Sequence, residues 1–150
     1  MGKSNRILIV SDSSYNPVKM FLDPTNKFAK GFIRLGNDVR TFSYRDTLRA
    51  CSPFKSKSLS SFFYKFKVDE LLVTEVANYE PHIVLVFLHG KLDRETIDLM
   101  RRASPNTVFI GFDADPWPRL QKGNRIETAK GLDILTATNS GEYLELRLYL

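Results

Sequence analysis

The chain has 150 residues, of which 43% are hydrophobic and 26% charged, a composition typical of a folded globular domain and not of a disordered or fibrous chain. Its one cysteine, Cys51, excludes an internal disulfide framework and a cysteine-rich zinc site, so we expect no metal. The net charge of +5 lies in one segment, because residues 40–67 carry +6 and the other 122 residues carry −1. The basic character therefore belongs to one patch, and we do not expect nucleic acid as the main partner.

The apolar runs are short. The longest ones, residues 7–10 and 83–88, hold six residues or fewer, so the sequence predicts no transmembrane segment. The first of these runs stops at Ser11, which is too early for a secretory signal. We expect a cytoplasmic protein, and contact with a membrane surface stays open as an alternative.

The first half of the chain predicts two strands around one helix. Residues 6–11 are apolar on both faces, as in a central parallel strand. Asp23 and Pro24 are typical of a helix start, and Gly36 of its end. Residues 39–44 alternate apolar and polar, which indicates a strand near a sheet edge.

The signals weaken over residues 45–66, where only a short helix from Ser60 suggests itself. Beyond this segment the pattern is regular again. It predicts helices over 68–79 and 93–103 and from Ser140 onward, and strands over 82–88, 107–112 and 132–137.

Five strands alternating with helices predict an α/β fold, because parallel neighbours need crossover connections. The edge-like second strand and the very apolar third strand favour the order 2-1-3-4-5. We therefore expect residues 1–150 to form one domain, a three-layer Rossmann-like doubly wound parallel sheet with helices on both faces.

In such a sheet, ligands bind at the carboxyl ends of the strands where the strand order reverses, here between the first and third strands. The polar residues that follow the strands are Asp12, Ser13, His89, Asp113, Asp115 and Trp117. The first turn has no glycine, the chain has no P-loop pattern, and Asp12 lacks the acidic neighbour of a phospho-receiver domain. We therefore expect no nucleotide cofactor bound in the first turn.

The turn over residues 113–118 has two carboxylates, Asp113 and Asp115, followed by the only tryptophan between two prolines. One interpretation is a sugar site, in which Asp113 and Trp117 bind the acceptor with Asp12 and Ser13. Asp115 is then the general base, with His89 as its rival. The other interpretation is structural: Asp115 caps a turn, Trp117 packs on the fold, and His89 and Asp12 are ordinary turn residues.

The basic segment interleaves its cations with seven aromatic residues. Its anion-binding candidates are Arg45, Arg49, Lys55 and Lys57. They suit a phosphate-bearing acceptor, an anionic membrane surface or single-stranded nucleic acid. The plain alternative is a solvated loop whose aromatic side chains belong to the core.

Five stretches carry a family resemblance: the opening strand at 6–10, "FAKGFIRLGNDV" at 28–39, "YEPHIVLV" at 79–86, "TVFIGFDADPWPR" at 107–119 and "GLDILTATNSGEYLELRL" at 131–148. Together they resemble the N-terminal half of GT-B glycosyltransferases, within them the spore-maturation CgeB-like group. The acidic turn at Asp113 and Asp115 matches the family best.

The resemblance implies that this chain is the acceptor-side domain of a glycosyltransferase, which transfers a sugar from a nucleotide-sugar to an acceptor hydroxyl. It implies a lipid- or phosphate-linked acceptor among the candidates, and a nucleotide-sugar domain that is missing here or separate. We do not expect activity from the domain alone. The alternatives are a stand-alone flavodoxin-like module that binds an anionic surface through residues 40–67, and a small ligand-sensing domain.

Overall fold

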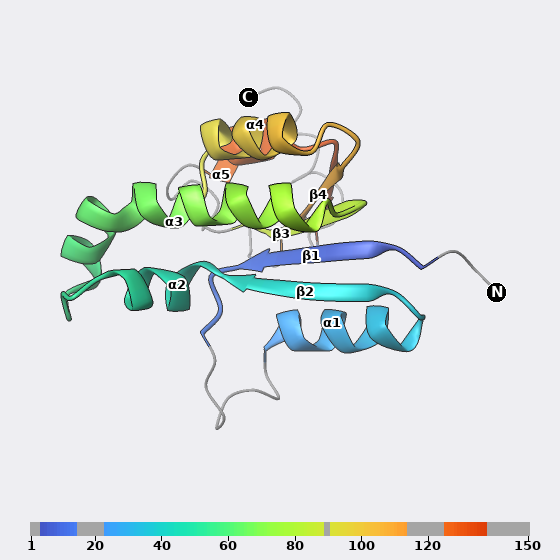
Figure 1. The fold of residues 1–150 in the computed structure, drawn as a ribbon, viewed down its shortest axis with the longest axis horizontal. Helices are drawn as coiled ribbons and strands as arrows, with labels where there is room; N and C mark the ends of the chain where they lie inside the picture. The colour runs from blue at the N-terminus through green and yellow to red at the C-terminus, as the bar shows by residue number, and fades with distance from the viewer. Residues whose placement is uncertain (1–3, 15–22, 89–90, 114–124, 138–150) are drawn as a thin grey trace.

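The computed structural model describes residues 4–14, 23–88, 91–113 and 125–137. They form five strands and five helices, with the strands in one sheet between two layers of helices (Figure 1). The elements are β1 (Arg6–Ser11), α1 (Pro24–Arg34), β2 (Asp38–Ser43), α2 (Tyr44–Cys51), α3 (Lys57–Tyr79), β3 (Ile83–Phe87), α4 (Arg94–Ala103), β4 (Val108–Asp113), α5 (Arg125–Lys130) and β5 (Ile134–Ala137).

The sheet is parallel throughout and has the order β2-β1-β3-β4-β5, which confirms the predicted fold class. The register sets Ile7 beside Ile83 and Ile83 beside Val108. The strand order reverses between β1 and β3, because β2 lies on one side of β1 while the chain continues on the other. The switch point of the fold therefore lies where the sequence predicts it.

Alternate residues of the strands enter two cores. Leu8, Val10, Val84, Val86 and Phe109 face the larger one, where α2, α3, α4 and α5 contribute partners such as Leu48, Leu72, Met100 and Ala129. Ile7, Ile9, Leu85 and Phe87 face the smaller one under α1, with Phe28 and Phe32 packed on them. Helices thus cover both faces of the sheet.

The segment with weak signals is where the structure departs most from the sequence analysis. Residues 44–51 form α2, and α3 begins at Lys57, well before the regular apolar pattern. Ser43 and Ser56 cap the two helices, since their side chains accept hydrogen bonds from the main-chain N–H groups of Asp46 and Leu59. The segment is therefore a helical pair and not a loop.

With 23 residues, α3 is about 35 Å long, while the five-residue β3 beside it spans roughly 17 Å. The first turns of α3 therefore extend past the carboxyl edge of the sheet, at the left of Figure 1. Despite its length, neither α3 nor any other helix in the described part of the chain is apolar enough to cross a membrane.

Candidate functional site at the carboxyl edge

Asp12 and Asp113 lie at the same level of the carboxyl edge. The register, extended by one residue beyond the ends of β1 and β3, sets Asp12, Leu88 and Asp113 in a row across three neighbouring strands. The N–H of Leu88 donates to the carbonyl of Phe112 at 3.0 Å, so pairing continues to this level. The two aspartates are two strand spacings apart, about 10 Å. By strand alternation both side chains fall on the sheet face of the larger core, and Asp113 is almost fully buried.

Asp12 is held by two cations, a group that we call the switch-point cluster (Asp12, Arg45 and Lys91). Lys91 Nζ donates to Asp12 Oδ1 at 2.6 Å, and Arg45 Nη2 donates to Oδ2 at 2.8 Å. Burial alone raises the pKa of Asp12, but the hydrogen bonds from Arg45 and Lys91 outweigh it and hold the pKa below its usual value. Asp12 is therefore a carboxylate at neutral pH, and the cluster carries one surplus positive charge.

Hydroxyl groups continue from this cluster toward α1. Ser13 Oγ is hydrogen-bonded to Ser11 Oγ at 2.5 Å and to Thr25 Oγ1 at 2.9 Å. Ser43 Oγ, at the end of β2, donates to the carbonyl of Ser13. These contacts fix the turn after β1 and link it to α1 and to the end of β2.

Tyr44 joins the switch-point cluster to a second one. Lys91 Nζ lies 5.8 Å from the centre of the Tyr44 ring, while the Tyr44 hydroxyl donates to Asp69 Oδ1 at 2.7 Å. Burial, together with the hydrogen bond to the Asp69 carboxylate, raises the pKa of Tyr44 far above its usual value. The phenol therefore keeps its proton and acts as a permanent donor.

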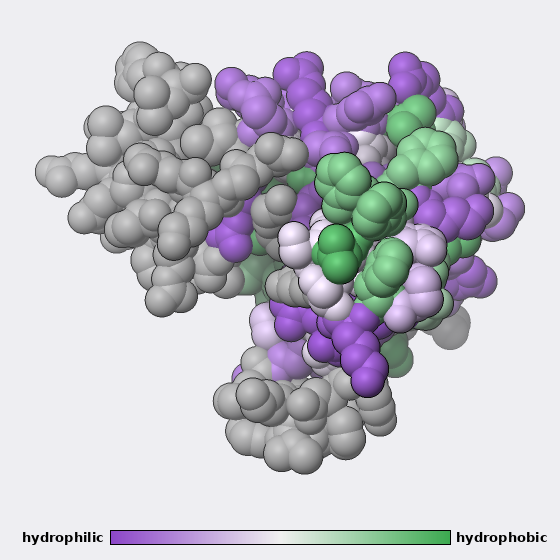
Figure 2. Space-filling model, turned by 90° about the vertical axis from the view of Figure 1, so that its left-hand side faces the viewer, coloured by the Kyte–Doolittle hydropathy of each residue, from purple (hydrophilic) through white to green (hydrophobic). Residues whose placement is uncertain are grey.

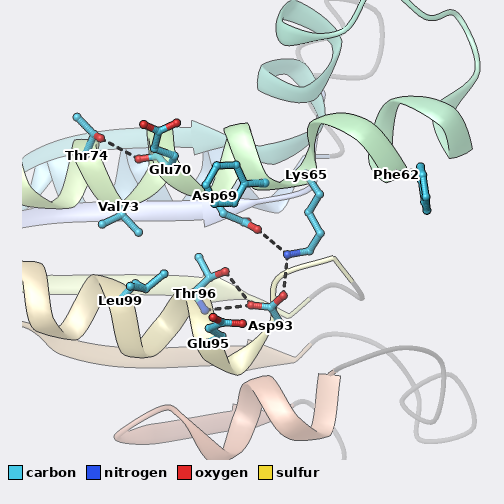
Figure 3. A pocket seen from close by; sticks show the side chains of 11 residues that line it. Phe62, Lys65, Asp69, Glu70, Val73, Thr74, Asp93, Glu95, Thr96 and Leu99 are labelled. Carbon is cyan, nitrogen blue, oxygen red and sulfur yellow. Dashed lines mark hydrogen bonds and ion pairs between the residues drawn. The ribbon is translucent and has the colours of Figure 1, made fainter.

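In the second cluster, a single cation bridges two carboxylates. Lys65 Nζ lies 2.6 Å from Asp69 Oδ2 and 2.7 Å from Asp93 Oδ2, tying α3 to the residue that caps α4 (Figure 3). Burial lowers the pKa of Lys65, but the two hydrogen bonds outweigh it and raise the pKa overall. Burial also raises the pKa of Asp69 in spite of the ion pair. We call Lys65, Asp69 and Asp93 the groove cluster; its surplus charge is negative.

The groove cluster sits in a groove of about 580 Å³ between α3 and α4. In Figure 3, α3 and α4 run side by side, with Asp69 and Val73 of α3 and Thr96 and Leu99 of α4 between them, while Glu70 and Thr74 lie on the other side of α3. Most of the lining surface is apolar. The lining residues are Phe62, Lys65, Phe66, Asp69, Glu70, Val73, Thr74, Asp93, Glu95, Thr96 and Leu99.

A second, more open hollow of about 630 Å³ connects the groove side with the switch-point cluster. Its lining includes Ser58, Ser61 and Phe62 of α3 together with Lys91. Phe62 lines both spaces, so it forms the ridge between them.

The phenylalanine patch (Phe54, Phe62, Phe63 and Phe66) covers the projecting end of α3. Phe62 is 82% exposed and Phe66 is 79% exposed. Phe63 packs against Phe54 and Phe62, with ring centres 5.8 and 5.0 Å apart. Figure 2 looks onto this end of the molecule and shows the hydrophobic side chains gathered beside hydrophilic ones. Such a patch is typical of an interaction surface. The alternative that the segment's aromatic side chains belong to the core is wrong for this patch, although Tyr44 is buried.

The predicted site residues separate into three groups. Asp12, Ser13, Asp113 and Arg45 are brought to the carboxyl edge. Arg49 lies 3.7 Å from Asp46 in an exposed pair, and Lys55 lies on the α2–α3 connection. His89, Asp115, Trp117 and the side chain of Lys57 fall outside the described residues, so their roles stay predictions.

Sequence reasoning missed Lys91 and the groove cluster. Lys91 reaches Asp12 across 79 positions of the chain, so no local pattern reveals the pair. Lys65 and Asp69 stand four residues apart, a spacing that predicts an ion pair on a helix, but the helix itself was not predicted to begin early enough.

Chemically, the carboxyl edge offers a fixed carboxylate, two cations, a row of hydroxyls and an apolar wall. This set suits a ligand that carries hydroxyl groups and an anionic group, since serine hydroxyls and a carboxylate bind the former while Arg45 and Lys91 bind the latter. Within the described ranges, no three His, Cys, Asp or Glu side chains are grouped as metal ligands.

Comparison with known proteins adds only a distant likeness. No protein-family model matches the chain, and no curated protein matches it. Among solved structures, the chain is similar to an adenylate cyclase from Rhodopirellula baltica, with 14% identity over 98% of this chain and 84% of that chain and a TM-score of 0.45. At this level the similarity carries no argument about activity.

Proposed function

We propose that the chain binds the acceptor of a sugar-transfer reaction at its carboxyl edge, as the acceptor-side domain of a GT-B glycosyltransferase. The observation that carries the proposal is the switch-point cluster. A carboxylate and two cations meet in the row with buried Asp113, at the point where a parallel sheet of this order binds ligands. The resemblance of five sequence stretches to that family supports the same assignment.

The surplus charge narrows the acceptor class. Lys91 and Arg45 share a single carboxylate, so one positive charge is left for an anionic group. The open hollow beside Lys91 is bounded by the Phe62 ridge, which suits an apolar chain attached to that group. We therefore favour an acceptor whose hydroxyl-bearing part is linked to a phosphate and, through it, to a lipid.

In this proposal, Asp115 is the acceptor-side general base and His89 its rival, with Asp113 and Trp117 holding the acceptor. The donor sugar comes from a nucleotide-sugar domain that acts as the partner of this one. The chain alone binds the acceptor and does not transfer sugar. In an enzyme with both halves, we expect Asp115→Ala to lower the transfer rate more than it lowers stability.

Binding to the isolated chain tests the proposal directly. We would titrate it with a methyl hexoside, a hexose 1-phosphate and uridine diphosphate, and follow the amide resonances of residues 11–13 and Lys91. We expect the hexose 1-phosphate to shift these resonances and to bind about tenfold more weakly to Arg45→Met, which loses a charge-assisted contact. The matched control is Arg101→Met, since Arg101 pairs with Asp133 at 3.0 Å and is 36% exposed, like Arg45.

Two results would count against the acceptor site. One is a sugar phosphate that leaves residues 11–13 and Lys91 unchanged. The other is tight binding of the nucleotide alone, which would point to the ligand-sensing alternative.

A second candidate function is contact with an anionic bilayer, favoured by the exposed phenylalanine patch. Phenylalanine side chains flanked by lysine are typical of segments that lie in the membrane interface. Lys55, next to Phe54, is exposed, whereas Arg45, Arg49, Lys65 and Lys67 are paired with carboxylates. In this role the protein is cytosolic and peripheral.

Vesicle sedimentation distinguishes this function. We expect phosphatidylglycerol vesicles to bind the chain with a steep salt dependence, and Phe63→Ser to weaken binding about fivefold by removing buried apolar area. Leu35→Ser is the control, because Leu35 is 77% exposed and directly follows α1, which covers the opposite face of the sheet. Equal binding to neutral vesicles, or preference for a single-stranded oligonucleotide, would contradict it.

A further inference from the structure

The groove between α3 and α4 has a continuous apolar stripe. On α3, Phe62, Phe66 and Val73 follow one another at spacings of four and seven residues, which places them on one side of the helix. On α4, Leu99 lies opposite and is 38% exposed. From Phe62 to Thr74 the α3 wall runs for about 18 Å. That length matches roughly three turns of another helix.

The same groove is acidic. Four carboxylates line it, from Asp69, Glu70, Asp93 and Glu95, against the one ammonium of Lys65. Lys65 is already shared between Asp69 and Asp93 at 2.6 and 2.7 Å, so Glu70 and Glu95 are not neutralised by it. Glu70 makes an exposed pair with Lys67, with both side chains more than half exposed. The lining therefore has a net charge of −3, opposite in sign to the segment that supplies one of its walls.

Hydrogen bonds and ion pairs within the chain hold the walls of the groove, α3 and α4, in place without a partner. Asp93 caps α4 by accepting hydrogen bonds from the N–H and the hydroxyl of Thr96, at 3.0 and 2.7 Å. Its other oxygen holds Lys65, and Lys65 holds Asp69, which also accepts from buried Tyr44. A groove whose walls are pre-organised in this way loses little conformational entropy on binding.

We propose that this groove binds a cationic amphipathic helix of another protein, about three turns long, with its apolar stripe on Phe62, Phe66, Val73 and Leu99 and its lysine or arginine residues beside Glu70 and Glu95. A helix that binds in a groove contacts it through apolar residues spaced three, four and seven positions apart. The carboxylates select the charge of the partner, because like charges across an interface are costly. An anionic bilayer is disfavoured at this groove for the same reason. The inference goes beyond the acceptor site, which lies on the other side of Phe62.

The test uses two helical 14-residue probe peptides with the same leucine stripe. One carries lysine on its polar face, and the other carries glutamate. We expect the lysine peptide to bind the wild-type chain at least about tenfold more tightly than the glutamate peptide, as electrostatic complementarity requires. In the double variant Glu70→Lys/Glu95→Lys we expect this preference to reverse.

The matched control is Glu80→Lys/Glu127→Lys, which changes the net charge by the same amount on exposed residues away from the groove. It should change the affinity for the lysine peptide less than about threefold, because screening weakens distant charges. Phe66→Ser should weaken the lysine peptide about tenfold with the fold intact, since Phe66 is 79% exposed.

Three results would overturn the proposal. The first is an equal loss of affinity for the lysine peptide in the control variant and in the groove variant, which would reduce the effect to net charge. The second is a dimer of the chain in sedimentation equilibrium that Phe66→Ser abolishes, which would make a second copy the occupant. The third is displacement of the peptide by phosphatidylglycerol vesicles, which would assign the groove to lipid binding.

Discussion

The switch-point cluster and the groove cluster are built on opposite plans. In the first, the carboxylate of Asp12 is shared by two cations, with Arg45 Nη2 and Lys91 Nζ at 2.8 and 2.6 Å. In the second, the ammonium of Lys65 is shared by two carboxylates, Asp69 and Asp93. Tyr44 touches both, with its ring beside Lys91 and its hydroxyl on Asp69.

The comparison shows how a positively charged cluster and a negatively charged cluster can lie close together near the carboxyl edge of the sheet. The central ion of each cluster is satisfied twice, so each cluster is locally stable, but the outer ions of each are satisfied only in part. The first cluster is left with a surplus cation and the second with a surplus carboxylate. Four substitutions test this comparison, beginning with the central lysine.

Lys65→Met should have the largest effect. It leaves Asp69 and Asp93 without their common cation, and an uncompensated, largely buried carboxylate is costly, so we expect a loss of about 3 kcal/mol in the free energy of unfolding. Urea denaturation measures it. Lys67→Met is the control, since Lys67 pairs with Glu70 on the surface and should cost less than about 0.5 kcal/mol. Equal losses in the two variants would show that the bridge is not special.

Asp12→Asn should come second, with a loss of about 1.5 kcal/mol at neutral pH, because Arg45 and Lys91 lose their counter-charge. The effect should depend on pH. The pKa of Asp12 is lower in the folded chain than in the unfolded one, so its contribution is fully present above about pH 4 and disappears as the pH falls through the folded pKa.

The variant and the wild type should therefore converge in acid. Urea denaturation at a series of pH values measures this. The control is Asp98→Asn, whose exposed pair with Arg94 at 3.9 Å should cost less than about 0.5 kcal/mol. A difference for Asp12→Asn that stays constant into acid would show that its carboxylate charge contributes nothing.

Tyr44→Phe should have a smaller effect, because it removes one hydrogen bond and keeps the ring beside Lys91. We expect a loss of about 1 kcal/mol. The pKa of Asp69, already raised by burial, should rise further, since the Tyr44 hydrogen bond lowers it. A carbon NMR titration of the Asp69 carboxyl reports this. Tyr79→Phe removes a hydrogen bond to the carbonyl of Asp38 and should leave that titration unchanged.

Arg45→Met should have the smallest effect on stability. Lys91 still holds Asp12 and Arg45 is 36% exposed, so we expect a loss of about 0.5 kcal/mol or less by thermal denaturation. Binding of the hexose 1-phosphate should nevertheless weaken. A large loss of stability would instead assign Arg45 to structure, leaving the cluster no cation for a ligand.

The sheet was predictable because its strands are local signals. A run of apolar residues such as 83–88 indicates a strand that is buried on both faces of a parallel sheet. The alternation of apolar and polar residues at 39–44 indicates a strand at the edge of the sheet. The first turns of α3 were not predictable in this way. Ser60, a buried position on the core side, is polar and bonds to Ser52 Oγ and to the carbonyl of Phe54. The phenylalanines lie on the exposed side, which inverts the usual amphipathic pattern.

The candidate site was predictable only as far as topology reaches. Asp12 and Asp113 follow strands, and parallel strands bring their carboxyl ends together. The partners of Asp12 are Arg45 of α2 and Lys91, which precedes α4. Contacts between residues so far apart in the chain cannot be predicted from the spacing of residues in the sequence. For the same reason Arg45 was grouped with a basic patch, although it pairs with Asp12.

Because the first turns of α3 extend beyond the sheet, one part of this helix tolerates substitutions and the other part does not. Residues such as Val68, Leu72 and Val76 are completely buried and hold the domain together. Residues 58–63, apart from Ser60, support no strand, so their side chains can be exchanged, and the wall they form can be reshaped, while the scaffold persists. We expect the sequences of related chains to differ most at these positions. Substitutions in these two helical turns should therefore be enough to change which ligand or partner the protein binds.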